Sequence, residues 1–488
     1  NLENALRKSS QASINVKRRL DPSLQLYCKG VYTMMEERVA QVAADIWDKE
    51  ISPQTAHILK RNLIDSYAGL CGALLDNRLI ATLGRMVRLV PDEKGITVWG
   101  VGHRAQALQA VFMNTILGRR IDLVNTYFSP SNMGINHPSD NVSLLLTLAD
   151  WKKLTGRDFL QAMQAAYTLS CAFSDYYDPE PAGYDHDAAA AFYVSLTSGL
   201  VEGLDVTGLI EAQRIAGVMG LNPDQTGVGL VTDWKHCTYA SCAQRGVQAV
   251  LMAKAGFKGP VDIYEGQAGW NRFLPHADSF MASPPDLSTV VFKSWPALVF
   301  CQTAIDVAAE LSSRFLDQDW KNVERIKVET YKKAVEEAGG ETSNKPDSRA
   351  GRTHSLPYCV AEALLKGGVE YHSFGDQRAM DPELVEVMGK VEVIADRQMT
   401  AAFPAQAPCR LTVEYQNRQP LSAFQERPHG DPQDPLSDQE IGAKVLKYLT
   451  GLAGLEQAEG ILARLWHLEE EDDLVWLLTP LRQGMSNT

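Results

Sequence analysis

Apolar side chains recur at helical spacing along the first half of the chain. Val39, Ala43 and Ile46 fall on one face of a helix, and Ser52-Pro53 then has the character of a second helix start. Residues 34–270 are therefore predicted to be mostly helical, and their frequent alanines and glycines permit close approach of neighbouring helices. The further helices predicted in this part span residues 144–154, 159–173, 188–201, 209–220 and 240–255.

The pattern changes near residue 288, where runs begin that alternate in polarity or are rich in β-branched residues. Such runs predict strands. Two helices are predicted between them, at Thr303–Phe315 and Tyr358–Leu365, so residues 288–425 read as an α+β segment. The predicted strands are Val290–Lys293, Val323–Thr330, Val391–Ile394 and Arg410–Tyr415.

A proline-rich linker, Pro428–Pro435, follows the α+β segment. Ser437 and Glu440 then have the spacing of a capping box, in which each side chain accepts a hydrogen bond from the backbone of the other. A last helical segment is therefore predicted over residues 437–485.

Composition and charge limit the kinds of partner. Hydrophobic residues make up 45% of the 488 residues and charged residues 22%, which is typical of a soluble globular protein of two or three domains. Lys and Arg total 47 against 60 for Asp and Glu, a net charge of -13. This balance argues against nucleic acid or an anionic membrane as the main partner, although a local basic pocket can still bind a small anion. No apolar run approaches the roughly 18 residues that a membrane-spanning helix needs.

The eight cysteines form no C-x-x-C pair and are scattered over helical and strand-like segments. A disulfide framework is not expected, and a reducing compartment, the cytoplasm or the mitochondrial matrix, fits this usage. Residues 1–20 are basic and contain several serines, which fits either the remnant of a mitochondrial transit peptide or a solvated terminus. No metal-ligand spacing such as H-E-x-x-H occurs, so neither a metal nor another cofactor is expected.

A polar loop precedes the predicted buried helix at 144–154. It gathers Asp122, Thr126, His137 and Asn141 within 20 residues. The His-Pro-Ser-Asp-Asn sequence at 137–141 also suits a helix start, because Pro favours the first turn and Ser and Asp favour the N-terminus. A helix start does not explain the histidine, whose neutral form is favoured at such a position and suits proton transfer near pH 7. The loop is therefore predicted to be both a helix start and a site that handles protons.

Further candidate residues lie at the ends of predicted elements. Each has a plain structural alternative: Lys235 as a surface lysine, for example, or the segment 183–187 as a helix cap. Together they indicate a cationic, histidine-bearing pocket for a small polyanion in an otherwise acidic protein. The residues are His186, Lys235, Lys293, Arg352, His354 and Tyr358.

These motifs, in this order, resemble the MmgE/PrpD family over residues 36–480. That family includes 2-methylcitrate dehydratases, cis-aconitate decarboxylases and iminodisuccinate epimerases. The most specific pieces are Ile121-Asp-Leu-Val-Asn-Thr-Tyr, His137-Pro-Ser-Asp-Asn, Lys293-Ser-Trp-Pro-Ala, Arg352-Thr-His-Ser-Leu-Pro-Tyr, and Lys235 followed by the run from Gly246 to Pro260.

The resemblance implies a fold that is mainly α with an α+β lid: a large all-helical domain built from both chain ends, plus a smaller α+β domain. It also implies a homodimer. The expected divisions are an N-terminal extension (1–33), a helical domain (34–287), an α+β lid domain (288–427) and a C-terminal helical segment that returns to the helical domain (428–488).

The resemblance also implies roles for the candidate residues. Lys235, Lys293 and Arg352 would neutralise carboxylates, while His137 and Asp122 would share proton transfer and Tyr358 would donate to a leaving hydroxyl. The expected catalytic residues are His137, Asp122, Lys235, Tyr358 and His186. The expected substrate-binding residues are Thr126, Lys293, Arg352, His354 and Asn141.

Within the family, the His-Pro-Ser-Asp-Asn motif most resembles the 2-methylcitrate dehydratase branch. The expected reaction is elimination of water from a 2-methylcitrate or alkylcitrate-like tricarboxylate by acid–base chemistry without a metal. The sequence departs from the family where a histidine or arginine often follows the Lys-x-x-Pro turn, because residues 298–300 are Leu-Val-Phe here. The acidic pair usual before Thr126 is also replaced, by Val124 and Asn125. An apolar patch at 298–300 would accommodate an alkyl substituent. Alternatives are a cis-aconitate-type decarboxylase or isomerase, or a non-catalytic member that binds a tricarboxylate.

Overall fold

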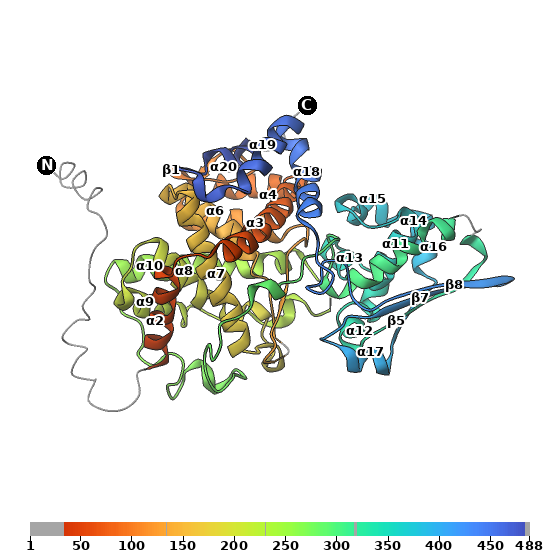
Figure 1. Cartoon of the computed structure of the whole chain (residues 1–488), viewed down its shortest axis with the longest axis horizontal. Helices are drawn as coiled ribbons and strands as arrows, with labels where there is room; N and C mark the ends of the chain where they lie inside the picture. Colours follow the sequence, from red (N-terminus) through yellow and green to blue (C-terminus); the bar gives the residue numbers. More distant parts are fainter. Residues whose placement is uncertain (1–33, 133, 230, 317–319, 484–488) are drawn as a thin grey trace.

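The computed structural model describes residues 34–483 except 133, 230 and 317–319. The expected N-terminal extension, 1–33, lies outside the described residues. The described chain is mostly helical, with one four-stranded sheet and two short two-stranded sheets. Figure 1 shows a helical part beside a smaller part that carries the larger sheet.

The helical part begins as its hydrophobic pattern predicts. Helix α2 (Met35–Asp48) buries Val39 and Ala43, and α3 (Pro53–Ala73) starts where Ser52 accepts a hydrogen bond from the backbone of Thr55. Helix α4 (Asn77–Val87) follows. Helix α5 (Ala107–Arg119) comes next. The predicted helices between residues 144 and 255 are confirmed, with ends that differ by a few residues. They are α6 (Asp140–Lys152), α7 (Gly156–Tyr176), α8 (Ala190–Val201), α9 (Val206–Ala216) and α10 (Thr238–Lys254).

Residues from both ends of the chain share one hydrophobic core. Leu63 of α3 and Val445 of α18 (Asp438–Ala453) belong to it, and these two helices pack against each other. The predicted capping box is present: Ser437 and Glu440 each accept a hydrogen bond from the backbone N–H of the other. Helices α19 (Leu455–Leu465) and α20 (Val475–Gln483) complete this end, seen in dark blue in Figure 1.

The smaller part has its own core around a mixed sheet with strand order β6-β5-β7-β8. Strands β5 and β6 are parallel, and the other neighbours are antiparallel. The strands are β5 (Val323–Thr330), β6 (Val391–Ala395), β7 (Cys409–Tyr415) and β8 (Arg418–Gln425). The helices are α11 (Gln302–Leu316), α12 (Lys332–Ala338), α13 (Arg349–Thr353), α14 (Leu356–Lys366), α15 (Asp376–Ala379), α16 (Pro382–Met388) and α17 (Arg397–Ala402).

The strand predicted at Val290–Lys293 is wrong. Only Val291 pairs there, in an isolated bridge in which it exchanges two backbone hydrogen bonds with Thr126. The run is apolar because it is buried where the chain passes from one core to the other: Phe292 belongs to the first core and Ala297 to the second. This passage carries Lys293 to the loop that precedes α6.

The remaining short elements are β1 (Pro91–Thr97) with β2 (Arg104–Ala105), and β3 (Tyr127–Phe128) with β4 (Ile135–Asn136). The second pair is a hairpin that leads into α6 and places Ile135 in the second core. All seven cysteines in the described residues are free. Among the described helices, none is both long and apolar enough to cross a membrane.

Candidate active site

A cavity of about 240 Å³ is lined by residues of both parts of the molecule. Its lining contains both polar and apolar side chains. We name as the polar wall the residues Arg119, Asp122, His137, His186, Lys235, His236 and His354. The apolar members are Ile135, Val228, Val231, Leu298, Val299 and Phe300, so the predicted apolar patch at 298–300 does line the cavity.

His137 stands between β4 and α6, where Pro138 and Ser139 form a tight turn into the helix. Its Nδ1 lies 2.9 Å from the carbonyl oxygen of Asn125, so Nδ1 carries the proton and donates it there. In the described residues no hydrogen-bond partner faces Nε2, which is left as a lone-pair acceptor on the cavity wall. Burial, and then the positive charge of Arg119, holds the pKa of His137 well below its usual value. The neutral histidine predicted from the helix start is thus explained mainly by burial.

Arg119, at the end of α5, organises the wall beside His137. Its Nε donates to Asp140 at 3.1 Å, and its Nη2 lies 3.2 Å from Nε2 of His186. Because a guanidinium only donates, this His186 nitrogen is the acceptor. Burial lowers the pKa of His186 to about 3, so its ring is also neutral. The rings of His137 and His186 meet edge to face with centroids 5.2 Å apart.

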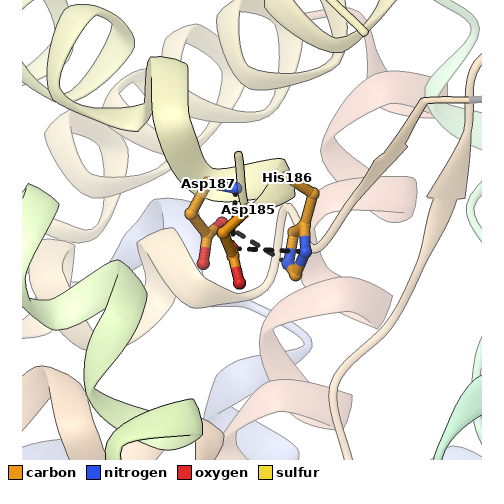
Figure 2. A group of neighbouring side chains, drawn as sticks. All are labelled: Asp185, His186 and Asp187. Carbon is orange, nitrogen blue, oxygen red and sulfur yellow. Dashed lines mark hydrogen bonds and ion pairs between the residues drawn. The ribbon is translucent and has the colours of Figure 1, made fainter. Parts of the chain in front are cut away.

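Asp185, His186 and Asp187 project together from the turn before α8, as Figure 2 shows. Their ligand-type atoms lie within 4.8 Å of one another, which is a spacing that suits a metal ion. The carboxylates already have cationic partners, however: Lys235 Nζ lies 3.3 Å from Asp185, and Arg119 Nη2 lies 3.4 Å from Asp187. Burial still raises the pKa of Asp187 to about 8. We read the cluster as one ion pair, Asp185 with Lys235, beside a buried carboxyl group, Asp187, that contacts Arg119, and assign no metal to it.

Asp122 and Lys293 form a second buried pair. Lys293 Nζ lies 2.9 Å from Oδ1 of Asp122 and 3.1 Å from its backbone oxygen. Asp122 has a φ of 56°, in the left-handed region, which turns its carbonyl and its side chain toward the same ammonium group. Burial opposes ionisation of Asp122, but the Lys293 charge holds its pKa below the usual value. Asp122 therefore presents a carboxylate at the cavity.

Two more histidines complete the polar wall. His354 donates from Nδ1 to the carbonyl oxygen of Ala350 at 2.8 Å. His236, in the turn before α10, receives a hydrogen bond at Nδ1 from Arg120, at 3.3 Å. Burial lowers the pKa of both rings. Both histidines are therefore neutral, but their Nε2 atoms differ: Nε2 of His354 is an acceptor, and Nε2 of His236 carries the proton.

Five of the predicted site residues line the cavity and five do not. Asp122, His137, His186, Lys235 and His354 line it. Of the others, Thr126 and Asn141 lie behind His137: the Thr126 hydroxyl is 3.3 Å from its Nδ1, and the Asn141 amide donates to the Pro138 carbonyl at 3.0 Å. Lys293 likewise lies behind Asp122. These three contacts position the catalytic candidates.

Arg352 and Tyr358 point elsewhere. Arg352 donates to Asp376 at 2.7 Å and to the Phe374 carbonyl at 2.9 Å. The hydroxyl of Tyr358 donates to the Ser373 carbonyl at 2.5 Å, inside the second core. Both side chains therefore tie α13 and α14 to the segment 373–376, and neither contributes to the cavity lining among the described residues.

Four acidic side chains of the cavity lining, here named the acidic edge, had not been predicted. They are Glu180, Asp224, Glu336 and Glu337. Burial, with the nearby negative charges, raises the pKa of Asp224 to about 6. Arg119 and His236 had not been assigned to the site either, although Arg119 stands three residues before Asp122 and His236 directly follows Lys235. That adjacency was the only signal for them.

Family models cover most of the chain. The model of the MmgE/PrpD N-terminal domain matches residues 37–282, and that of the MmgE/PrpD C-terminal domain matches residues 295–468. The chain belongs to the MmgE/PrpD family. The boundary between the two matches falls where the chain passes from the first core to the second.

Similar members of the family carry two different names. A 2-methylcitrate dehydratase of Cupriavidus necator is 25% identical over 74% of this chain and 79% of its own length. A cis-aconitate decarboxylase of Mus musculus is 22% identical over 88% of this chain and 95% of its own length. A mitochondrial 2-methylcitrate dehydratase of Yarrowia lipolytica is 22% identical over 65% of this chain and 64% of its own length.

Proposed function

We propose that this protein is a lyase that eliminates water from a 2-methylcitrate or alkylcitrate-like tricarboxylate. The observation that carries the proposal is the state of His137: a neutral ring whose Nδ1 proton is held by the backbone and whose Nε2 is free at a cavity that also contains Arg119 and Lys235. A free imidazole nitrogen beside two cations is the arrangement needed to remove a proton next to a carboxylate. Family relatives named as dehydratases support the same class of reaction.

The proposed reaction starts with transfer of a proton from the carbon next to a carboxylate to His137 Nε2. Negative charge then develops on that carboxylate, where Arg119 and Lys235 stabilise it. The carbon–oxygen bond to the hydroxyl breaks, the carbon–carbon double bond forms, and the departing oxygen takes a proton to leave as water. The imidazolium of His137, formed in the first step, is the proposed source of that proton, since the Tyr358 hydroxyl is engaged with the Ser373 carbonyl.

The lining combines cationic and apolar side chains, which suits a polyanionic substrate that also carries an apolar group. The side chains of Leu298, Val299 and Phe300 carry no charge and consist only of hydrocarbon. An alkyl substituent on the citrate skeleton would be desolvated there, at a gain of about 0.8 kcal/mol per buried methylene. We therefore propose an alkyl-substituted citrate rather than citrate itself.

Turnover with matched substrates tests the proposal. The protein is incubated with 2-methylcitrate, with a longer alkylcitrate and with cis-aconitate. A dehydratase generates an absorbance in the ultraviolet from the first two as the conjugated alkene forms, and releases no carbon dioxide. Release of carbon dioxide from cis-aconitate, with no alkene from either citrate, would instead identify a decarboxylase.

Decarboxylation is the second candidate function. One observation favours it: the cis-aconitate decarboxylase of Mus musculus matches a larger share of both chains than the dehydratases do. The same cations would bind the carboxylates, and a protonated residue would deliver a proton to the carbanion that forms when carbon dioxide leaves. A tricarboxylate that binds without either reaction would indicate a non-catalytic member.

Two further expectations stay proposals. We propose that the protein forms a homodimer, as the family resemblance implies, which light scattering on the purified chain tests. We also propose a reducing compartment, either the cytoplasm or the mitochondrial matrix. The free cysteines and the mitochondrial relative of Yarrowia lipolytica support this location, and imaging of the tagged protein tests it.

A further inference from the structure

Two residues that line the cavity each have a buried atom, of opposite polarity, with no hydrogen-bond partner within the described part of the chain. One is Oδ2 of Asp122, whose residue is 7% exposed, and the other is Nε2 of His236, whose residue is 3% exposed. Buried polar atoms almost always have a hydrogen-bond partner. An unpaired donor and an unpaired acceptor in the lining of one cavity therefore indicate that a bound group supplies the missing partners.

His236 is fixed as a donor by its neighbour. Arg120 Nη1 lies 3.3 Å from Nδ1 of His236, and a guanidinium has no acceptor, so Nδ1 must accept. In the neutral ring the proton is then on Nε2. Arg120 is itself held by Asp76 at 2.6 Å and by Asp233 at 2.8 Å, which prevents it from turning away. Because Nδ1 faces Arg120, the N–H at Nε2 of His236 points away from Arg120.

Asp122 is fixed as an acceptor in a similar way. Lys293 occupies Oδ1 and keeps the group ionised, which leaves Oδ2 with lone pairs only. Both side chains line one cavity, and among the described residues no hydrogen bond joins these two atoms.

A hydroxyl is the substrate group that satisfies both atoms at once, because its oxygen accepts and its proton is donated. We propose that His236 and Asp122 bind the hydroxyl of the substrate, with the His236 N–H donating to the hydroxyl oxygen and the hydroxyl donating to Asp122 Oδ2. This inference rests on the proposed function and adds a residue to it. His236 is then the specificity-determining residue that distinguishes a hydroxylated tricarboxylate from an unsaturated one, and its N–H stabilises the oxygen as the carbon–oxygen bond breaks.

Binding of two acids that differ only in the hydroxyl tests the proposal. Citrate and propane-1,2,3-tricarboxylate form such a pair, and calorimetry on the full chain with a His137→Gln background avoids turnover. We expect a preference for citrate of about tenfold or more, since one hydrogen bond is worth roughly that factor. His236→Leu is expected to weaken citrate about tenfold and to leave the deoxy acid within about twofold. His236→Gln keeps an N–H donor and is expected to recover part of the preference.

The control is His467→Leu, which replaces an exposed histidine and should change neither affinity. Equal loss of both acids in His236→Leu, or a citrate preference that survives it, would overturn the role of His236, and the two atoms would then be satisfied by water. If the protein dehydrates an alkylcitrate while binding the two acids equally, the hydroxyl inference fails and the proposed function stands. If neither acid binds and no alkylcitrate is dehydrated, both fail.

Discussion

The histidines on the cavity wall differ in which ring nitrogen the protein holds. His137 and His354 donate from Nδ1 to backbone carbonyls, so each presents a lone pair, whereas His236 accepts at Nδ1 and presents an N–H. A single hydrogen bond at the far nitrogen thus decides whether a neutral ring takes a proton or donates a hydrogen bond. The residue type alone does not carry this information.

Replacing His137 with Gln should remove the proposed base while leaving the loop in place, because Gln fills a similar volume and can still donate to the Asn125 carbonyl. We expect turnover of an alkylcitrate to fall by about 100-fold or more, the usual contribution of a general base. The affinity for the substrate should change little. Stopped assays and calorimetry measure the two effects, and near wild-type turnover would remove His137 from the mechanism.

The pH dependence of turnover follows from the direction of the His137 shift. Its pKa lies well below the ordinary value of 6.5, mainly because of burial, and the base works only when neutral. As pH falls from 8 to about 6, the ring should therefore stay neutral and kcat should hold, with the decline displaced to lower pH. A profile of kcat at saturating alkylcitrate checks this. Half-loss of kcat near pH 6.5 would show an exposed, unshifted histidine instead.

At the scale of elements, small residues set how closely the helices around the site approach. Gly246 of α10 faces α8, where an added Cβ would lie 2.4 Å from a methyl of Val194. Helix α10 follows the turn that carries Lys235 and His236, and α8 follows the one that carries His186. The distance between these two helices therefore sets the distance between His186 on one side of the site and Lys235 and His236 on the other.

Gly246→Ala should force α10 and α8 apart and lower the free energy of unfolding by about 1–3 kcal/mol, the usual cost of overpacking a filled interface. The matched control is Gly460→Ala on α19, where an added Cβ meets nothing within 4 Å. That change should stabilise the protein by about 0.5–1 kcal/mol, because Ala is the better helix former. Urea unfolding of both variants measures the difference, and equal effects would contradict the packing argument.

Hydrophobic periodicity predicted most elements because it reports one buried face directly. It failed where burial has another cause. The run Val290–Lys293 is apolar because it passes between two cores, and β8 escaped prediction because it is mostly exposed and carries Pro420. Strand patterns are clearest when one face alternates into a core. Neither segment shows this alternation between a buried and an exposed face.

The motifs of the candidate site could be predicted from the sequence, but the hydrogen-bond partners of its side chains could not. His137 and Lys235 stand at the starts of helices, where polar residues in a row are visible in the sequence. The hydrogen bonds of these side chains join residues that are separated in the chain. Tyr358 donates to the Ser373 carbonyl, and Arg120 donates to both Asp76 and His236. Such contacts depend on the packing of several elements and leave no local pattern.

On the scale of the whole molecule, the cavity lies where the helical part and the sheet-containing part meet, and one lysine links the two parts at its edge. Lys333 of α12 lies 3.0 Å from Glu180, which precedes α8, and 2.8 Å from Glu337 in its own helix. Both glutamates line the cavity, as does Asp224. Lys333 therefore neutralises part of the acidic edge, which would otherwise repel the proposed polyanionic substrate.

Lys333→Met should leave that edge uncompensated and slow the entry of a tricarboxylate. We expect the association rate to fall roughly threefold or more at low ionic strength. The effect should shrink as salt approaches about 0.15 M, where the screening length is only about 8 Å. Lys390→Met is the control: it removes the same charge from the same part of the molecule, but Lys390 pairs with Glu386 at 3.3 Å, which does not line the cavity. Stopped-flow binding of citrate at two salt concentrations measures both variants. Equal slowing by the two changes would show that net charge alone matters, and a salt-independent loss in Lys333→Met would show that the link acts by holding the two parts together.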